Sequence, residues 1–156
     1  MACWSLVDSD SLVRMDQTLK PFEFIEHTGD LGVLVYGNGL PELFGNAAEA
    51  FFEVITDPEK VLERESRSIF LDSNDLEELL VAWLSEFLYL FDTNNLLFRR
   101  FSVHKVKKCT IEATAWGEVY DGERHPIKTV IKAVTFHQIQ VREEKGIWKA
   151  RVIFDL

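Results

Sequence analysis

The sequence predicts an α+β fold, a mostly antiparallel β-sheet sandwich with two amphipathic helices packed on one face. Two segments, at about residues 41–55 and 75–91, repeat apolar residues at the spacing of one helix face. From Leu97 onward, apolar and polar residues alternate in the way that is typical of half-buried strands. The chain has 156 residues, 47% of them hydrophobic, so one domain with a single buried core is expected.

Residues 1–20 are polar and aperiodic, and we expect a mobile N-terminal extension there, ahead of one domain at residues 21–156. Short strands are predicted at residues 22–25 and 32–36, where aromatic and β-branched side chains predominate. A turn at residues 27–30, which contains a glycine and an aspartate, is expected to join them.

The first helix is predicted to begin near Pro41, because proline suits a first helical turn, and to end before Asp57-Pro58. The second helix has the more continuous apolar stripe. We expect Asn74 to cap it, with Glu77 completing a capping box three residues later.

The remaining elements are predicted to be strands separated by short turns. Asp121-Gly122 and Lys145-Gly146 have the composition of hairpin turns. The strands are expected at residues 67–71, 98–106, 110–119, 127–140 and 148–154, the fourth of them broken near Phe136 and His137.

The net charge of −9 argues against direct, sequence-specific nucleic-acid binding, because affinity for phosphates comes mainly from Lys and Arg. A basic protein is the more favourable partner. Two isolated cysteines indicate a reducing compartment, and no apolar run of membrane-spanning length or secretory signal is visible. We therefore expect a cytoplasmic or nuclear protein, or one found in both, without membrane association.

The sequence lacks the motifs of nucleophilic triads, phosphate-binding loops, dinucleotide sites and helical zinc sites. Acidic groups remain, around the Glu26–Asp30 turn and at the chain end, where Asp155 precedes the carboxylate of Leu156. If the last strand pairs near this turn, three carboxylates converge. Such a cluster favours a hard divalent cation, Ca²⁺ or Mg²⁺, with oxygen ligands.

Each of these residues also has a simpler interpretation. Taken alone, Asp30 is a turn residue, Asp155 is a solvated chain end and His27 is a hydrogen-bonded structural histidine. Lys132 lies within an apolar run and is equally consistent with an outward-facing strand residue.

Several segments resemble the motifs of the archease family, and they occur in the family's order over about residues 21–156. Residues 26–32, EHTGDLG, are similar to the opening motif, with Gly29 in place of the more common alanine. The other resembling segments are residues 83–92, 115–118, 124–125, 131–137 and 148–155.

The resemblance implies an α+β sandwich that is not itself an enzyme. It implies an activator of the RtcB-type RNA ligase and its complex. That ligase uses GTP and Mn²⁺ in tRNA splicing. The activator promotes ligase guanylylation and multiple turnover.

The resemblance also implies a metal site at Asp30, Asp155 and the main-chain carboxylate of Leu156. Ca²⁺ is the expected cation, with Mg²⁺ or Mn²⁺ as alternatives. Glu26, His27 and Lys132 are lesser candidates, either for contact with the ligase or for support of the metal site.

Two other functions remain open. A general adaptor or chaperone-like module would use an exposed apolar patch, in keeping with the aromatic-rich composition. A metal-dependent hydrolase would use the carboxylate cluster, although no general base is visible beyond His27.

Overall fold

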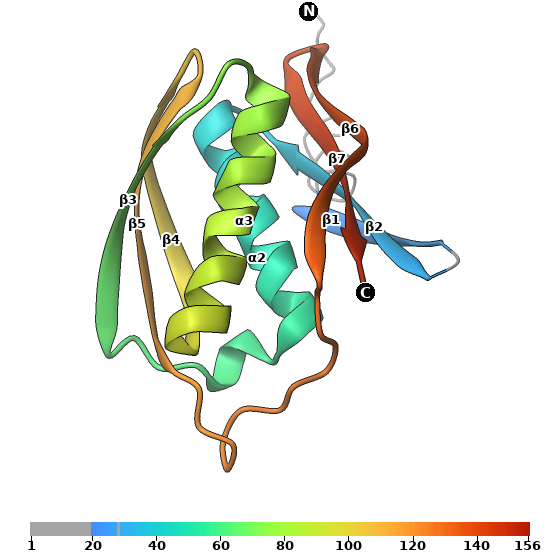
Figure 1. The fold of residues 1–156 in the computed structure, drawn as a ribbon. Helices are drawn as coiled ribbons and strands as arrows, with labels where there is room; N and C mark the ends of the chain where they lie inside the picture. The colour runs from blue at the N-terminus through green and yellow to red at the C-terminus, as the bar shows by residue number, and fades with distance from the viewer. Residues whose placement is uncertain (1–19, 28) are drawn as a thin grey trace, which may run out of the picture.

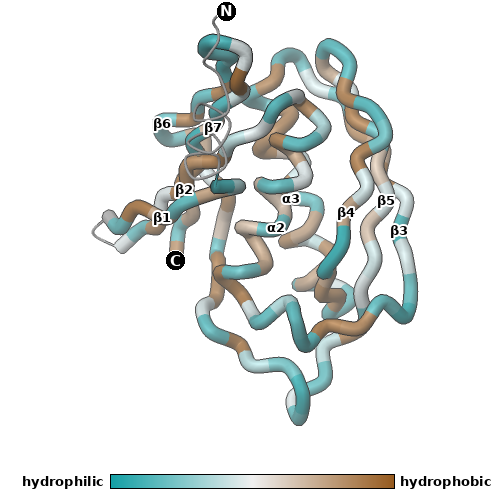
Figure 2. The backbone as a smooth tube through the Cα atoms, turned by 180° about the vertical axis from the view of Figure 1, so that it is seen from behind, coloured by the Kyte–Doolittle hydropathy of each residue, from teal (hydrophilic) through white to brown (hydrophobic). Residues whose placement is uncertain are grey.

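Two β-sheets enclose a central layer of two helices (Figure 1). The computed structural model describes residues 20–156, except residue 28. Seen from behind, the helices again lie between the sheets (Figure 2). The α+β class and the antiparallel pairing are confirmed. Each sheet has helices on one face, as expected, but the sequence did not show that two sheets share them.

The four-stranded sheet has the order β1-β2-β7-β6, so the first two strands of the described part of the chain lie beside the last two. The last strand pairs antiparallel with β2, and Val33 lies opposite Val152 on the buried face. The four strands of this sheet are β1 (Phe22–His27), β2 (Asp30–Gly37), β6 (Ala133–Glu144) and β7 (Ile147–Asp155).

The three-stranded sheet has the order β3-β5-β4 and covers the other side of the helices. Ile111, Ala113 and Ala115 face the core from its central strand. Its members are β3 (Glu65–Asp72), β4 (Leu96–Lys107) and β5 (Thr110–Val119). Gly117 is required where β5 meets β4, because an added Cβ would lie 1.8 Å from the carbonyl oxygen of Leu97.

The helices are α2 (Leu40–Ile55) and α3 (Leu76–Asn94), and one 3-10 turn lies at Pro58–Lys60. The indole Nε1 of Trp83 donates to the carbonyl oxygen of Phe44 over 2.9 Å and ties α3 to α2 inside the core. None of the helices in the described part of the chain is long and apolar enough to cross a membrane.

The capping prediction for α3 was wrong by one residue. Asp75 is the N-cap, and its side chain accepts from the N–H of Glu78. The side chain of Glu78 accepts in return from the N–H and the side-chain amide of Asn74. Asp75 and Glu78 therefore take the roles predicted for Asn74 and Glu77, one residue later, but Glu78 returns its hydrogen bonds to Asn74, the residue before the N-cap, and not to the N-cap itself.

Of the two predicted hairpin turns, the structure confirms one. Lys145 and Gly146 both have positive φ and join β6 to β7 as a two-residue hairpin, as predicted. The turn at Asp121-Gly122 does not form a hairpin, because β5 and β6 belong to different sheets. The chain instead crosses below the helices, so residues 127–132 are not part of a strand.

This crossover is held in place at the end of α2. The N–H of Lys128 donates to the carbonyl oxygen of Ile55 over 2.7 Å. The hydroxyl of Thr56 donates to the carbonyl oxygen of Pro126 over 2.6 Å. These bonds fix the path by which the chain reaches β6, and they therefore help to place Lys132 beside the end of β7.

Candidate acidic site

The acidic residues of the opening motif and of the chain end lie opposite each other. In the β2–β7 pair, Asp30 is the register partner of Asp155. Directly opposite residues of an antiparallel pair project to the same face, with Cβ atoms roughly 5 Å apart. The pairing that the sequence argument required is thus present.

Alternation along the strands shows which face carries this pair. Leu31 and Phe154 face the helices and pack in the core. Asp30 and Asp155, one residue away from them, therefore belong to the outer face of the four-stranded sheet. Among the described residues, no lysine or arginine forms an ion pair with either carboxylate. Two like charges that lie opposite without a counter-charge repel each other.

The end of β7 is anchored on its other side as well. The N–H of Lys132 donates to the carbonyl oxygen of Asp155 over 2.7 Å, and Ala133 is the register partner of Asp155 in β6. The side chain of Leu156 is half-buried and packs against the core. The main chain next to the acidic pair is therefore held from both sides.

The other two candidates lie on β1, at the edge of the sheet. Glu26 is opposite Leu31 in register, so its exposed side chain is directed to the face away from Asp30 and Asp155. His27 is the register partner of Asp30, but its side chain lies outside the described residues. The structure thus gives His27 a backbone position beside the pair and separates Glu26 from it.

The arrangement fits oxygen coordination of a divalent cation only in part. Among the side chains that the structure describes, no three His, Cys, Asp or Glu residues converge closely enough to hold a metal. Asp30 and Asp155 would therefore need a third protein donor, for which the main-chain carboxylate of Leu156 is the nearest candidate in sequence. Hard cations accept such donors, completed by water.

A second group of charged residues is centred on Glu118, near the end of β5. It lies between the loop that precedes β3 and the crossover that follows β5. The side chain of Glu118 is only 4% exposed. One of its oxygens accepts from the N–H of Leu62 at 2.7 Å and from Nε2 of His125 at 2.9 Å. Arg124 donates to both carboxylate oxygens, over 3.0 and 2.8 Å.

The protonation of this group follows from its hydrogen bonds. Nδ1 of buried His125 accepts from the N–H of Asp121, so Nε2 carries the hydrogen and donates it in a hydrogen bond to the carboxylate of Glu118. The hydrogen bonds from Arg124 are the largest cause that lowers the pKa of Glu118 to about 2, against the opposing effect of burial. Sequence reasoning noted these residues as motif members without a role. Their contacts show that they join the crossover to the loop before β3.

Comparison with known proteins adds to this geometry. Residues 22–156 match the model of the archease protein family. The chain belongs to the archease family.

Archeases of two archaea are among its relatives. The chain is 45% identical to the archease of Methanosarcina mazei over 141 residues, which cover 88% of the chain and 97% of the relative. It is 44% identical to the archease of Sulfurisphaera tokodaii over 129 residues, which cover 82% of the chain and 92% of the relative.

Solved structures agree on the fold. A Methanobacterium thermoautotrophicum protein, numbered 1598, has 41% identity, with a TM-score of 0.75 over 87% of this chain and 99% of that one. An archease of Thermotoga maritima, described as a possible chaperone, has a TM-score of 0.59 over 85% of this chain and 94% of that one. At 21% identity, this second likeness concerns the fold alone.

Proposed function

We propose that this archease activates the GTP-dependent RtcB-type RNA ligase of tRNA splicing, promoting ligase guanylylation and repeated turnover without catalysing ligation itself. The observation that supports the proposal is the opposition of Asp30 and Asp155 across β2 and β7. It places two carboxylates, which form no ion pair among the described residues, at one end of the outer sheet face, in a chain of net charge −9. Such a face attracts cations and basic protein surfaces.

We further propose that a divalent cation, preferably Ca²⁺, binds to Asp30, Asp155 and the main-chain carboxylate of Leu156. The two side chains lie opposite in register, and oxygen donors suit hard cations. When bound, the cation would compensate the repulsion between the carboxylates. The residues of this chain would present a fixed charged surface to the ligase, and Lys132 would add a positive charge at its margin.

The test is RNA ligation by the purified ligase, present in large deficit over RNA, with GTP and Mn²⁺. The archease should convert a single turnover into many. Asp30→Ala and Asp155→Ala should each reduce this stimulation at least tenfold while leaving the thermal unfolding midpoint in the absence of metal close to that of the parent.

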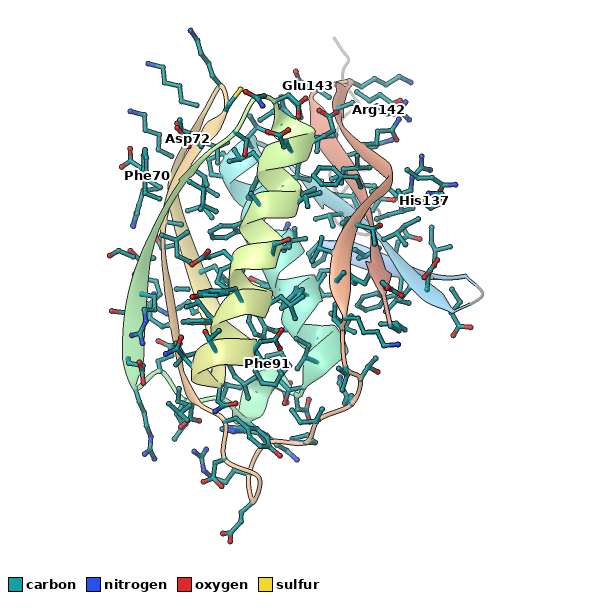
Figure 3. The ribbon with its side chains drawn as sticks, viewed as in Figure 1. Phe70, Asp72, Phe91, His137, Arg142 and Glu143 are labelled. Carbon is teal, nitrogen blue, oxygen red and sulfur yellow. The ribbon has the colours of Figure 1, made fainter. Side chains whose placement is uncertain are left out.

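Asp72→Ala is the matched control. Asp72 is an exposed aspartate at a strand end, on the opposite side of the molecule (Figure 3). This variant should stimulate as the parent does. Absence of stimulation by the parent protein would refute the activator function. Normal stimulation by both acidic-site variants would refute the role of the acidic pair alone.

A chaperone-like activity is the second candidate, because the protein exposes several large hydrophobic side chains. The large exposed hydrophobic side chains include Phe70 on β3 and Tyr89 on α3, which lie on different elements. This function predicts that the archease suppresses aggregation of several unrelated denatured proteins. Binding confined to the ligase complex would exclude it.

A further inference from the structure

Strand β6 contains a large bulge, with several inserted residues, beside the acidic pair. Thr135 is the partner of Ile153, and the next paired residue, Gln140, is the partner of Arg151. Residues 136–139 therefore lie opposite the single residue Val152. Bulges that insert several residues redirect side chains and recur near functional sites. The break that the sequence predicted near Phe136 is this bulge.

The bulge is held by specific hydrogen bonds. The hydroxyl of Thr135 donates to the carbonyl oxygen of Ile153 over 2.9 Å and accepts from the N–H of His137 over 3.2 Å. Nε of Arg151 donates to the carbonyl oxygen of Gln138 over 3.1 Å. Gln138 has φ of 54°, in the left-handed region that costs a non-glycine residue of order 1 kcal/mol. The bulge is therefore an ordered feature that the fold maintains at a cost.

The bulge displays an aromatic side chain to solvent. Ile139 packs back against the core, whereas Phe136 is 59% exposed. Burying a phenylalanine side chain contributes roughly 1.5–3 kcal/mol, and Phe136 forgoes most of this contribution in the free protein. Aromatic residues are enriched in protein–protein interfaces, so an exposed phenylalanine on an ordered support is a suitable anchor for a partner.

Its position relates it to the acidic pair. Phe136 lies three residues after Ala133, the partner of Asp155, a separation of roughly 10 Å along the strand. An interface of standard size, about 800 Å² on each partner, is wide enough to span this separation. In Figure 3 the neighbouring His137 projects away from the body of the molecule beside β6, and Phe70 lies on the opposite side beside β3.

We propose that Phe136 anchors the ligase, and that the acidic pair beside it supplies the charge that acts once the complex has formed. This inference rests on the proposed function. The complementary ligase surface is a basic one that contains an apolar recess for the phenylalanine ring. The bulge supplies affinity, and Asp30 and Asp155 supply activation.

The experiment measures two quantities for each variant, the Kd for the ligase and the ligation rate at saturating archease. Phe136→Ala should raise the Kd at least tenfold. It should restore the full rate once its concentration is raised accordingly. Asp30→Ala should show the reverse, with a Kd within about threefold of the parent and little activation at saturation.

Phe70→Ala is the matched control, because Phe70 is 64% exposed on the other sheet. It should leave both quantities unchanged, and the unfolding midpoints of both phenylalanine variants should match the parent. An unchanged Kd for Phe136→Ala, or an equal loss for Phe70→Ala, would overturn the anchor while the activator function stood. A parent protein that neither binds nor activates the ligase would refute both.

Discussion

At the scale of single residues, Glu118 connects parts of the chain that are distant in sequence. Its carboxylate accepts from Leu62 on one loop and from Arg124 and His125 on another. A buried carboxylate with these donors is favoured in its ionised form, and removing its charge leaves the donors without their partner. The group therefore stabilises the crossover that leads to β6.

Replacing Glu118 by Gln should lower the free energy of unfolding at pH 7 by roughly 1–3 kcal/mol. The pKa of Glu118 is about 2 in the folded protein against 4.5 for the unperturbed side chain. Because folding lowers this pKa, the stabilisation is complete above about pH 5 and is lost as the pH falls toward 2. It amounts to no more than roughly 3 kcal/mol, and solvent around the half-exposed Arg124 reduces it.

Urea unfolding between pH 7 and pH 2.5 measures this effect. The decrease in stability with falling pH should be shallower in Glu118→Gln than in the parent. Glu112→Gln is the control, because Glu112 is an exposed carboxyl on the same strand. Equal pH profiles for the parent and Glu118→Gln would show that the ion group contributes nothing to stability.

At the scale of elements, the start of α3 shows how closely a local pattern can place a helix. The motif of Asn74, Asp75 and two glutamates was sufficient to predict side-chain capping, but not which residue is the N-cap. Both Asn74 and Asp75 are good N-caps, and the choice between them depends on the direction from which β3 approaches. In the structure Asp75 has the extended backbone of the cap.

Asp75→Ala should therefore destabilise the protein by about 1 kcal/mol, because it removes the side-chain acceptor for the N–H of Glu78. Asn74→Ala should cost less, since the backbone N–H of Asn74 still donates to Glu78. Thermal unfolding of the two variants measures the difference. A larger loss for Asn74→Ala would contradict the assignment of Asp75 as the cap.

The helices themselves were predictable because each has an apolar face. The ring centroids of the core residues Phe52 and Phe87 are 5.6 Å apart, in an edge-to-face arrangement that joins α2 to α3. Both residues also contact Phe98 and Phe101 on β4. Periodicity identified the buried faces, but it did not identify which strand each face contacts.

At the scale of the whole molecule, the antiparallel pairing of β2 with β7 brings together residues 125 positions apart, Asp30 and Asp155. Their mutual repulsion and their proposed affinity for a cation have opposite effects on stability. Without a cation, the repulsion opposes folding, and binding of the proposed cation would favour folding.

Asp30→Asn should accordingly change the sign of its effect with Ca²⁺. In EDTA the variant should be as stable as the parent or slightly more stable, because it relieves the repulsion between like charges. In excess Ca²⁺ the parent should gain stability, about 2.7 kcal/mol at 100 times the Kd, and Asp30→Asn should not. Calorimetric unfolding midpoints with and without Ca²⁺ measure both arms.

Asp72→Asn, on the other sheet, should gain stability with Ca²⁺ as the parent does. The same gain in Asp30→Asn would exclude Asp30 as a ligand. Substituting Mg²⁺ or Mn²⁺ in the same measurement ranks the cations by the stability that each confers.

By itself, the sequence determined the α+β class, both helices, most strand positions, an irregularity of β6 near Phe136 and the acidic residues worth testing. These features depend on local periodicity, on turn chemistry and on motifs that lie within a few neighbouring residues. Failures occurred where an interaction spans the chain, as with the turn at Asp121-Gly122, whose composition is that of a hairpin although it begins a crossover between sheets.

Only the tertiary structure decided that two sheets share the helices, that Glu26 faces away from the acidic pair, and that Glu118 joins two loops. Each of these depends on strand register or on contacts between distant segments. Register is set by how both faces of a sheet are covered, and a shift of one residue would exchange those faces. The sequence alone therefore identifies the residues of the acidic site, whereas their convergence on one face depends on how the sheet folds.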